Sequence, residues 1–307
     1  MKKRTLLALV ALMAAIAMLA AACGGDDDSG AADTGSSAPE GPTITIRGQD
    51  FSESATIAQV YGQYLKAKGY DVNILEPAGF RTEALDGLKN GDFNLIVDYI
   101  GGDQTALAPD EKTTADPAAT ADIIRPLLAE QGSTLLDFSP ATDGDAMVVR
   151  GDFDGTTISD LKGANAKFGA SSQCFERPQC YIGLTDPDVY GITFASKKTI
   201  EFGPLLGEAL KAKEVDAVIW NTTAPQIEAD GFKVLEDDKG LFPAQNIAPI
   251  INTDTLNAYG DQLKTDLNDL SAQITTADLL AWNTATDIDK KESDQVASDW
   301  LGEKGLN

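Results

Sequence analysis

Histidine is missing from all 307 residues of this sequence. Its absence excludes Ser-His-Asp and Cys-His nucleophilic catalysis and also histidine-ligated zinc. The sequence also has no GxxxxGK[ST], no GxGxxG after a strand, no GxSxG and no CxxC. A hydrolase that works with a pair of carboxylates stays open as the alternative. We therefore expect no enzymatic activity, no cofactor and no metal site.

Basic residues are scarce. Lys and Arg together number 24 against 48 Asp and Glu, which gives a formal net charge of −24. A surface this acidic repels the phosphate backbone of DNA and RNA. We expect no nucleic-acid partner.

Long apolar runs are limited to one segment near the start, Leu6–Ala22, which follows a cluster of basic residues. This pattern predicts a secretory signal peptide over residues 1–22, too short for a comfortable transmembrane helix. The run ends directly before Cys23 and resembles the lipobox of bacterial lipoproteins, although Ala20 stands where a leucine is usual. Residues 23–41 are small, acidic and polar and predict a flexible linker. We expect a lipid anchor on Cys23 at the outer face of the bacterial cell membrane.

Cysteine is also rare, with three in the chain. Without Cys23, only Cys174 and Cys180 remain, separated by five residues. An exported protein meets oxidising conditions, so these two are predicted to form a disulfide. The loop that it closes is short, and the bridge is expected to stabilise the fold by about 2 kcal/mol or less.

The body of the chain alternates strand and helix patterns. Residues 43–97 read as strand, helix, strand, helix, strand, and residues 146–220 contain a second α/β set with a helix near 186–190. A strand over 246–252 is followed by three predicted helices. The expected fold class is α/β, with two lobes around a central ligand cleft.

The lobe boundaries follow from the position of the two sets. We expect a first lobe from residues 42–143 together with 246–307, and a second lobe from 144–245. The chain then passes between the lobes near 139–145 and 240–246, which are the expected hinge segments.

Several segments resemble, in order, motifs of the osmoprotectant-type substrate-binding proteins of ABC importers, which carry glycine betaine, choline or carnitine. These segments are GQDFSE at 48–53, FRTEAL at 80–85, GDFNL at 91–95, DYIGG at 98–102, FERPQCYIGL at 175–184, and VLEDDKG with FP at 234–243. The resemblance implies the type II periplasmic-binding-protein fold. It also implies an ABC permease and an ATPase as partners.

In this family the ligand lies in an aromatic cage, because a quaternary ammonium has no N–H to hydrogen-bond and is attracted by aromatic faces. By motif position the resemblance assigns Tyr99, Tyr181 and Trp220 to the cage and Arg177 to a ligand carboxylate. The other ligand-binding candidates come from the first of these segments, from the position just before the strand that begins at 146, and from IWNT at 219–222, which resembles the family's A-Y-S-T-D segment and also contains Trp220. They are Gln49, Phe51, Ser52, Asp145, Asn221 and Thr222.

The departures from the family pattern bear on the ligand. Gln49 replaces a lysine, Ile100 and Gly102 replace two threonines, and Asp145 replaces an aromatic residue. The pocket thus has fewer groups for a carboxylate and one more acid. We expect a small quaternary-amine ligand closer to choline than to betaine, held by a cage loop that the predicted disulfide fixes.

The function expected from the sequence is therefore capture of a choline- or betaine-like osmoprotectant and its delivery to the permease. Two alternatives stay open beside it. One is a binding protein of the same fold for another solute, such as an amino acid or an ergothioneine-like betaine. The other is a lipoprotein sensor that does not transport.

Overall fold

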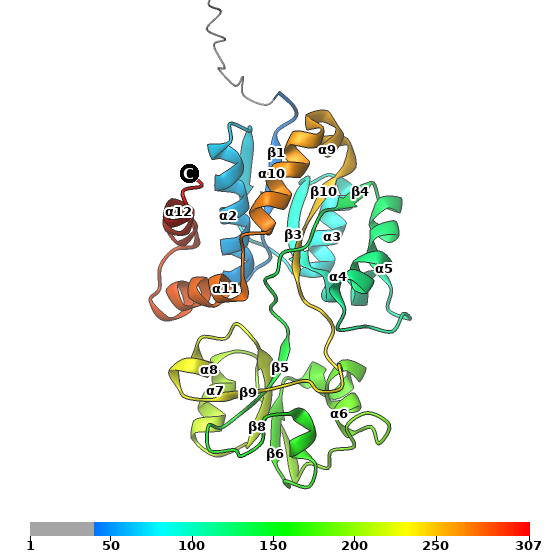
Figure 1. The fold of residues 1–307 in the computed structure, drawn as a ribbon, viewed down its shortest axis with the longest axis vertical. Helices are drawn as coiled ribbons and strands as arrows, with labels where there is room; N and C mark the ends of the chain where they lie inside the picture. Colours follow the sequence, from blue (N-terminus) through cyan, green and yellow to red (C-terminus); the bar gives the residue numbers. More distant parts are fainter. Residues whose placement is uncertain (1–39) are drawn as a thin grey trace, which may run out of the picture. The chain divides into compact units, whose positions relative to one another are not determined.

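The structure is a computed structural model that describes residues 40–307 (Figure 1). The predicted signal peptide, Cys23 and the linker up to residue 39 lie outside the described residues. No helix within 40–307 combines the length and apolar character needed to cross a bilayer.

A mixed sheet forms the centre of the first lobe. Its strand order is β2-β1-β3-β10-β4, with parallel pairing among the first three strands and antiparallel pairing of β10 with both β3 and β4. The strands are β1 (Ile44–Arg47), β2 (Val72–Leu75), β3 (Leu95–Tyr99), β4 (Ser133–Leu135) and β10 (Ile247–Asn252).

Helices cover both faces of this sheet, because successive apolar side chains along the central strands point to opposite faces. On β3, Leu95 and Val97 face one apolar core, which includes α2 and α12, while Ile96 faces a second core with α3 and α5. A sheet buried on both faces favours such continuous apolar strands. The helices of this lobe are α2 (Ser52–Ala67), α3 (Arg81–Asn90), α4 (Ile100–Leu107), α5 (Pro117–Glu130), α9 (Thr253–Tyr259), α10 (Asp261–Ser271), α11 (Thr276–Asn283) and α12 (Ser293–Lys304).

The second lobe is built on a sheet of order β7-β6-β8-β5-β9. Its strands are β5 (Asp145–Val149), β6 (Lys167–Ala170), β7 (Ser196–Thr199), β8 (Ala217–Asn221) and β9 (Lys233–Leu235). Its α-helices are α6 (Gly183–Thr185), α7 (Pro204–Lys211) and α8 (Gln226–Ala229). The disulfide Cys174–Cys180 is present and buried in this lobe.

Two details differ from the sequence-based expectation. Residues 186–190 form a turn and not a helix, because Pro187 favours an extended Asp186, whose carboxylate accepts a hydrogen bond from the Asp188 N–H at 2.9 Å. The end of the chain holds four α-helices and not three, since Gly260 with φ 69° separates α9 from α10. A π-helical turn, Thr284–Ile288, extends α11.

Two backbone segments connect the two lobes (Figure 1). They form an isolated antiparallel bridge with each other at Thr142 and Asn246. The Asn246 amide donates to the Ser139 carbonyl at 2.9 Å and reinforces this crossing. We propose the lobe boundaries 42–143 with 246–307, and 144–245, on the basis of this pairing.

Candidate ligand-binding site

A cavity of about 570 Å³ is lined by residues of both lobes. Its lining includes Gln49 just after β1, Tyr99 at the end of β3, and Trp220 and Asn221 at the end of β8. The carboxyl ends of strands in open α/β sheets are where ligands bind, since loops and helix starts leave polar groups free there. Strand ends from both sheets therefore converge on this one cavity.

A buried carboxylate, Glu53, connects the two lobes beside the cavity. It lies in the first turn of α2, where the helix dipole favours a negative charge, and it is 3% exposed. It accepts hydrogen bonds from the Tyr99 hydroxyl, the Thr223 hydroxyl at 2.8 Å and the Asn283 amide at 2.6 Å. Thr223 follows β8 of the second lobe, so this carboxylate ties the lobes together.

Asp143, on the crossing segment, makes a second acid beside Glu53. Burial raises the pKa of Glu53 above its ordinary value, although its three hydrogen-bond donors oppose the shift. Burial and the charge of Glu53 raise the pKa of Asp143 well above its usual range. The negative charge beside the cavity therefore depends on pH, and it is of the sign that a cationic ligand needs.

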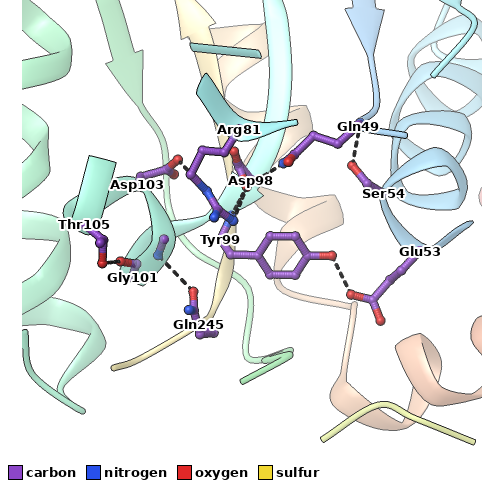
Figure 2. A network of polar contacts seen from close by, with 11 residues as sticks. Gln49, Glu53, Ser54, Arg81, Asp98, Tyr99, Gly101, Asp103, Thr105 and Gln245 are labelled. Atoms are coloured by element: carbon purple, nitrogen blue, oxygen red, sulfur yellow. Dashed lines mark hydrogen bonds and ion pairs between the residues drawn. The ribbon is translucent and has the colours of Figure 1, made fainter. Parts of the chain in front are cut away.

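An ion-pair network lies next to these acids (Figure 2). Arg81, the first residue of α3, places its Nη2 3.1 Å from Asp98 Oδ1 and its Nε 3.6 Å from Asp103 Oδ1. The same Asp98 oxygen accepts from the Gln49 amide at 2.9 Å and from the Tyr99 N–H at 2.7 Å. Burial and the charge of Asp98 raise the pKa of Asp103 well above its usual range. The network therefore fixes the position of the guanidinium group at the wall of the cavity.

Exposed aromatic rings line the same cavity. Phe51 is 37% exposed, Phe80 62% and Phe202 57%, and the ring of Phe51 stacks on that of Tyr99 with centroids 6.2 Å apart. Trp220 also lines the cavity but is 2% exposed, because its ring packs in the core of the second lobe. Rings from both lobes thus face a shared space, as a cage for a quaternary ammonium requires.

The structure places most of the predicted site residues together. The cavity lining includes Gln49, Phe51, Ser52, Tyr99, Trp220 and Asn221.

Arg177 and Asp145 lie apart from that group. They form an ion pair of 2.7 Å at a smaller cavity of about 250 Å³. Arg81 and Gln245 line both cavities, so the two spaces adjoin.

Tyr181 and Thr222 line neither cavity. The ring of Tyr181 packs in an aromatic cluster of the second lobe, with centroids 5.3 Å from Phe175 and 5.7 Å from Phe168. The Thr222 hydroxyl accepts from the Gly144 N–H at 3.1 Å and supports the crossing between the lobes.

Several residues of the site were not singled out from the sequence. Glu53 and Arg81 stand inside the quoted motifs, at helix starts, and that position was the available signal. Asn283 and Thr223 are far from Glu53 in the chain, and Phe202 stands outside the quoted motifs. Only folding brings these last three to the cavity.

Comparison with known proteins gives a consistent result. The family described as the substrate binding domain of ABC-type glycine betaine transport system matches residues 42–303. The chain is 25% identical over 284 residues to a glycine-betaine-binding protein of Pseudomonas aeruginosa, covering 86% of this chain and 88% of that protein. It is 24% identical over 268 residues to the carnitine transport binding protein OpuCC of Listeria monocytogenes, covering 84% and 86%.

The fold agrees with a solved structure as well. A crystal structure of a glycine betaine/carnitine/choline ABC transporter superposes with a TM-score of 0.77 at 25% identity, covering 86% of this chain and 99% of that one. This likeness confirms the predicted α/β fold class with the two lobes of periplasmic binding proteins.

Proposed function

The chain belongs to the family of substrate-binding domains of ABC-type glycine betaine transport systems, and on that premise we propose that it captures choline or a betaine and delivers it to a permease. Members of this family are solute-binding proteins of importers and not enzymes, and they work outside the cytoplasm. A cytoplasmic ATPase drives the release of the ligand through the permease. Closure of the two lobes on the ligand is a hinge motion about the paired crossing segments.

One observation carries the proposal: exposed rings of both lobes line a single cavity together with Glu53 and Asp143, two acids of the first lobe. A tetra-alkyl ammonium cannot donate a hydrogen bond, so aromatic faces and carboxylates are the groups that can hold it. Each aromatic contact contributes about 0.5–2 kcal/mol once water is excluded. Three such contacts with one acid support affinities near micromolar, about −8 kcal/mol.

The proposal includes a lipid anchor on Cys23, which places the protein at the outer face of the bacterial membrane. Two or more acyl chains hold a protein on a bilayer durably, whereas one chain binds reversibly. Membrane fractionation of the expressed protein tests this part. A Cys23→Ser protein should appear in the soluble fraction, and unchanged membrane retention would contradict the anchor.

A ligand panel tests the main proposal. We expect choline, glycine betaine or carnitine to raise the melting temperature of the purified full-length protein, since a ligand at about a hundred times its Kd adds roughly 2.7 kcal/mol. Proline and other amino acids should not raise it. If no quaternary amine raises the melting temperature, the ligand class is wrong; a shift with amino acids alone would favour the alternative solute.

The position of the ligand is tested by Phe202→Ala. Its ring is 57% exposed, so the unliganded melting temperature should change little while the ligand-induced shift becomes smaller. The matched control is Val234→Ala, which removes an exposed apolar side chain on β9, outside the cavity lining. An equal ligand shift in both variants would place the ligand elsewhere.

A further inference from the structure

Arg81 is ion-paired on one side of its guanidinium group and lies at the wall of the cavity with the other. Arg81 lines both cavities, and its Nη1 forms no hydrogen bond to any residue within 40–307 and is not one of the buried atoms that lack a partner. The Arg81 carbon Cζ lies 5.9 Å from the centroid of the Tyr99 ring (Figure 2). An N–H group of a positively charged side chain therefore lies beside an aromatic ring at the wall of the cavity.

Gly102 makes this position possible. A Cβ atom at Gly102 would lie 2.2 Å from Cζ of Arg81, closer than atoms can approach. Gly102 is the second glycine of the DYIGG segment and lies in α4, outside the left-handed region, so the backbone alone does not require glycine. The missing side chain leaves the space that the guanidinium group fills.

The other arginine near the cleft, Arg177, is also ion-paired, but it lies at the smaller cavity. Arg177 Nη2 lies 2.7 Å from Asp145 Oδ2, and both residues belong to the second lobe and the smaller cavity. Arg81 is paired with two carboxylates, at 3.1 Å from Asp98 Oδ1 and 3.6 Å from Asp103 Oδ1, and it lies at the wall of the larger cavity. Of these two arginines, Arg81 is the one that lines the larger cavity.

We propose that Arg81 is the residue that binds the carboxylate of a betaine ligand, a quaternary ammonium that also carries an acidic group. Gly102 and Asp98 act as positioning residues for this contact. The inference rests on the proposed function and narrows it, and it reverses the preference for choline expected from Gln49 and Asp145. Arg81, and not Arg177, then distinguishes glycine betaine from choline.

The test compares Kd values for glycine betaine and choline by isothermal titration on the purified full-length protein. In Arg81→Met, we expect affinity for glycine betaine to fall about ten- to a hundredfold, the usual effect of losing a charge-assisted hydrogen bond, with choline within about threefold. Gly102→Ala keeps the charge but displaces the guanidinium group, and it should produce the same selective loss. Arg177→Met is the matched control, with about threefold change or less for either ligand.

The outcomes separate cleanly. An unchanged ratio of the two affinities in Gly102→Ala and Arg81→Met overturns the inference, as does a selective loss confined to Arg177→Met. If Arg81→Met does not fold because Asp98 is left unpaired, Gly102→Ala decides the question. Failure of both ligands to bind the unmodified protein contradicts the proposed function itself, and the inference falls with it.

Discussion

Replacement of Tyr99 by phenylalanine isolates the contact that holds Glu53. The hydroxyl of Tyr99 is one of three donors to that carboxylate, and Tyr99 is 4% exposed. Tyr99→Phe keeps the ring in place and leaves a buried carboxylate short of one hydrogen bond. Such a loss costs about 1–3 kcal/mol of the free energy of unfolding.

The expected change in melting temperature follows from the size of the protein. At about 2–4 °C per kcal/mol, Tyr99→Phe should lower the melting temperature by roughly 2–12 °C near pH 8. The hydrogen bond from Tyr99 also lowers the pKa of Glu53, so its removal raises a pKa that burial has already raised. A protonated Glu53 carries no charge and needs one hydrogen-bond donor fewer than the carboxylate. The decrease in melting temperature caused by Tyr99→Phe should therefore be smaller near pH 4. Thermal unfolding followed by circular dichroism at both pH values measures both effects.

Tyr61→Phe provides the control. The Tyr61 hydroxyl is fully buried in the same lobe and bonds the neutral Ser271 hydroxyl at 2.9 Å. Its removal should lower the melting temperature by an amount that does not depend on pH between 4 and 8. The reasoning about Glu53 is refuted if Tyr99→Phe behaves in the same pH-independent way, or if it has no effect.

Three further perturbations test other parts of the structure. Because the pKa of Glu53 is raised in the folded state, Glu53 should stabilise the protein at pH values below its ordinary pKa of 4.5, and this stabilisation should be lost as the pH rises. Choline affinity should show the opposite trend and increase with pH, because the carboxylate becomes negatively charged. Glu53→Gln should flatten both pH profiles, which thermal unfolding and titration calorimetry measure. Phe80→Ala, at a ring that is 62% exposed, should leave stability within about 0.5 kcal/mol but weaken ligand binding, unlike Val234→Ala; equal affinities would remove Phe80 from the site. The pair Cys174→Ala and Cys180→Ala should lower stability by about 2 kcal/mol in denaturant unfolding and weaken binding, and unchanged affinity would separate the disulfide from the site.

The sequence predicts the fold class because its strong patterns are local. The apolar runs at 93–97 and 216–220 overlap the buried strands β3 and β8, and Tyr99 and Trp220, near the ends of these strands, line the cavity. The expectation for Tyr181 rested on its motif alone, and neighbouring rings draw it into the second lobe. Packing between aromatic side chains is decided by tertiary contacts that a motif does not contain.

The rest of the site depends on contacts between distant segments. The hydrogen bond from Asn283 to Glu53 joins positions 230 residues apart, and no periodicity of the sequence relates them. The contact between Arg81 and Gly102 could be proposed only once a helix start and a following helix are seen side by side. In the sequence, Gly102 is recognised only as the loss of a threonine of the family motif. In the structure, its missing side chain leaves the space that the Arg81 guanidinium group fills.

The position of β10 makes the first sheet depend on a late part of the chain. Strand β10 lies between β3 and β4, yet it follows the whole second lobe in the chain, so the first sheet stays incomplete until residue 252 is available. The second sheet needs only residues 145–235. Non-local pairing of this kind slows folding, because a long loop must close before the contacts form. Slow completion of the larger lobe suits a chain that crosses a membrane before it folds.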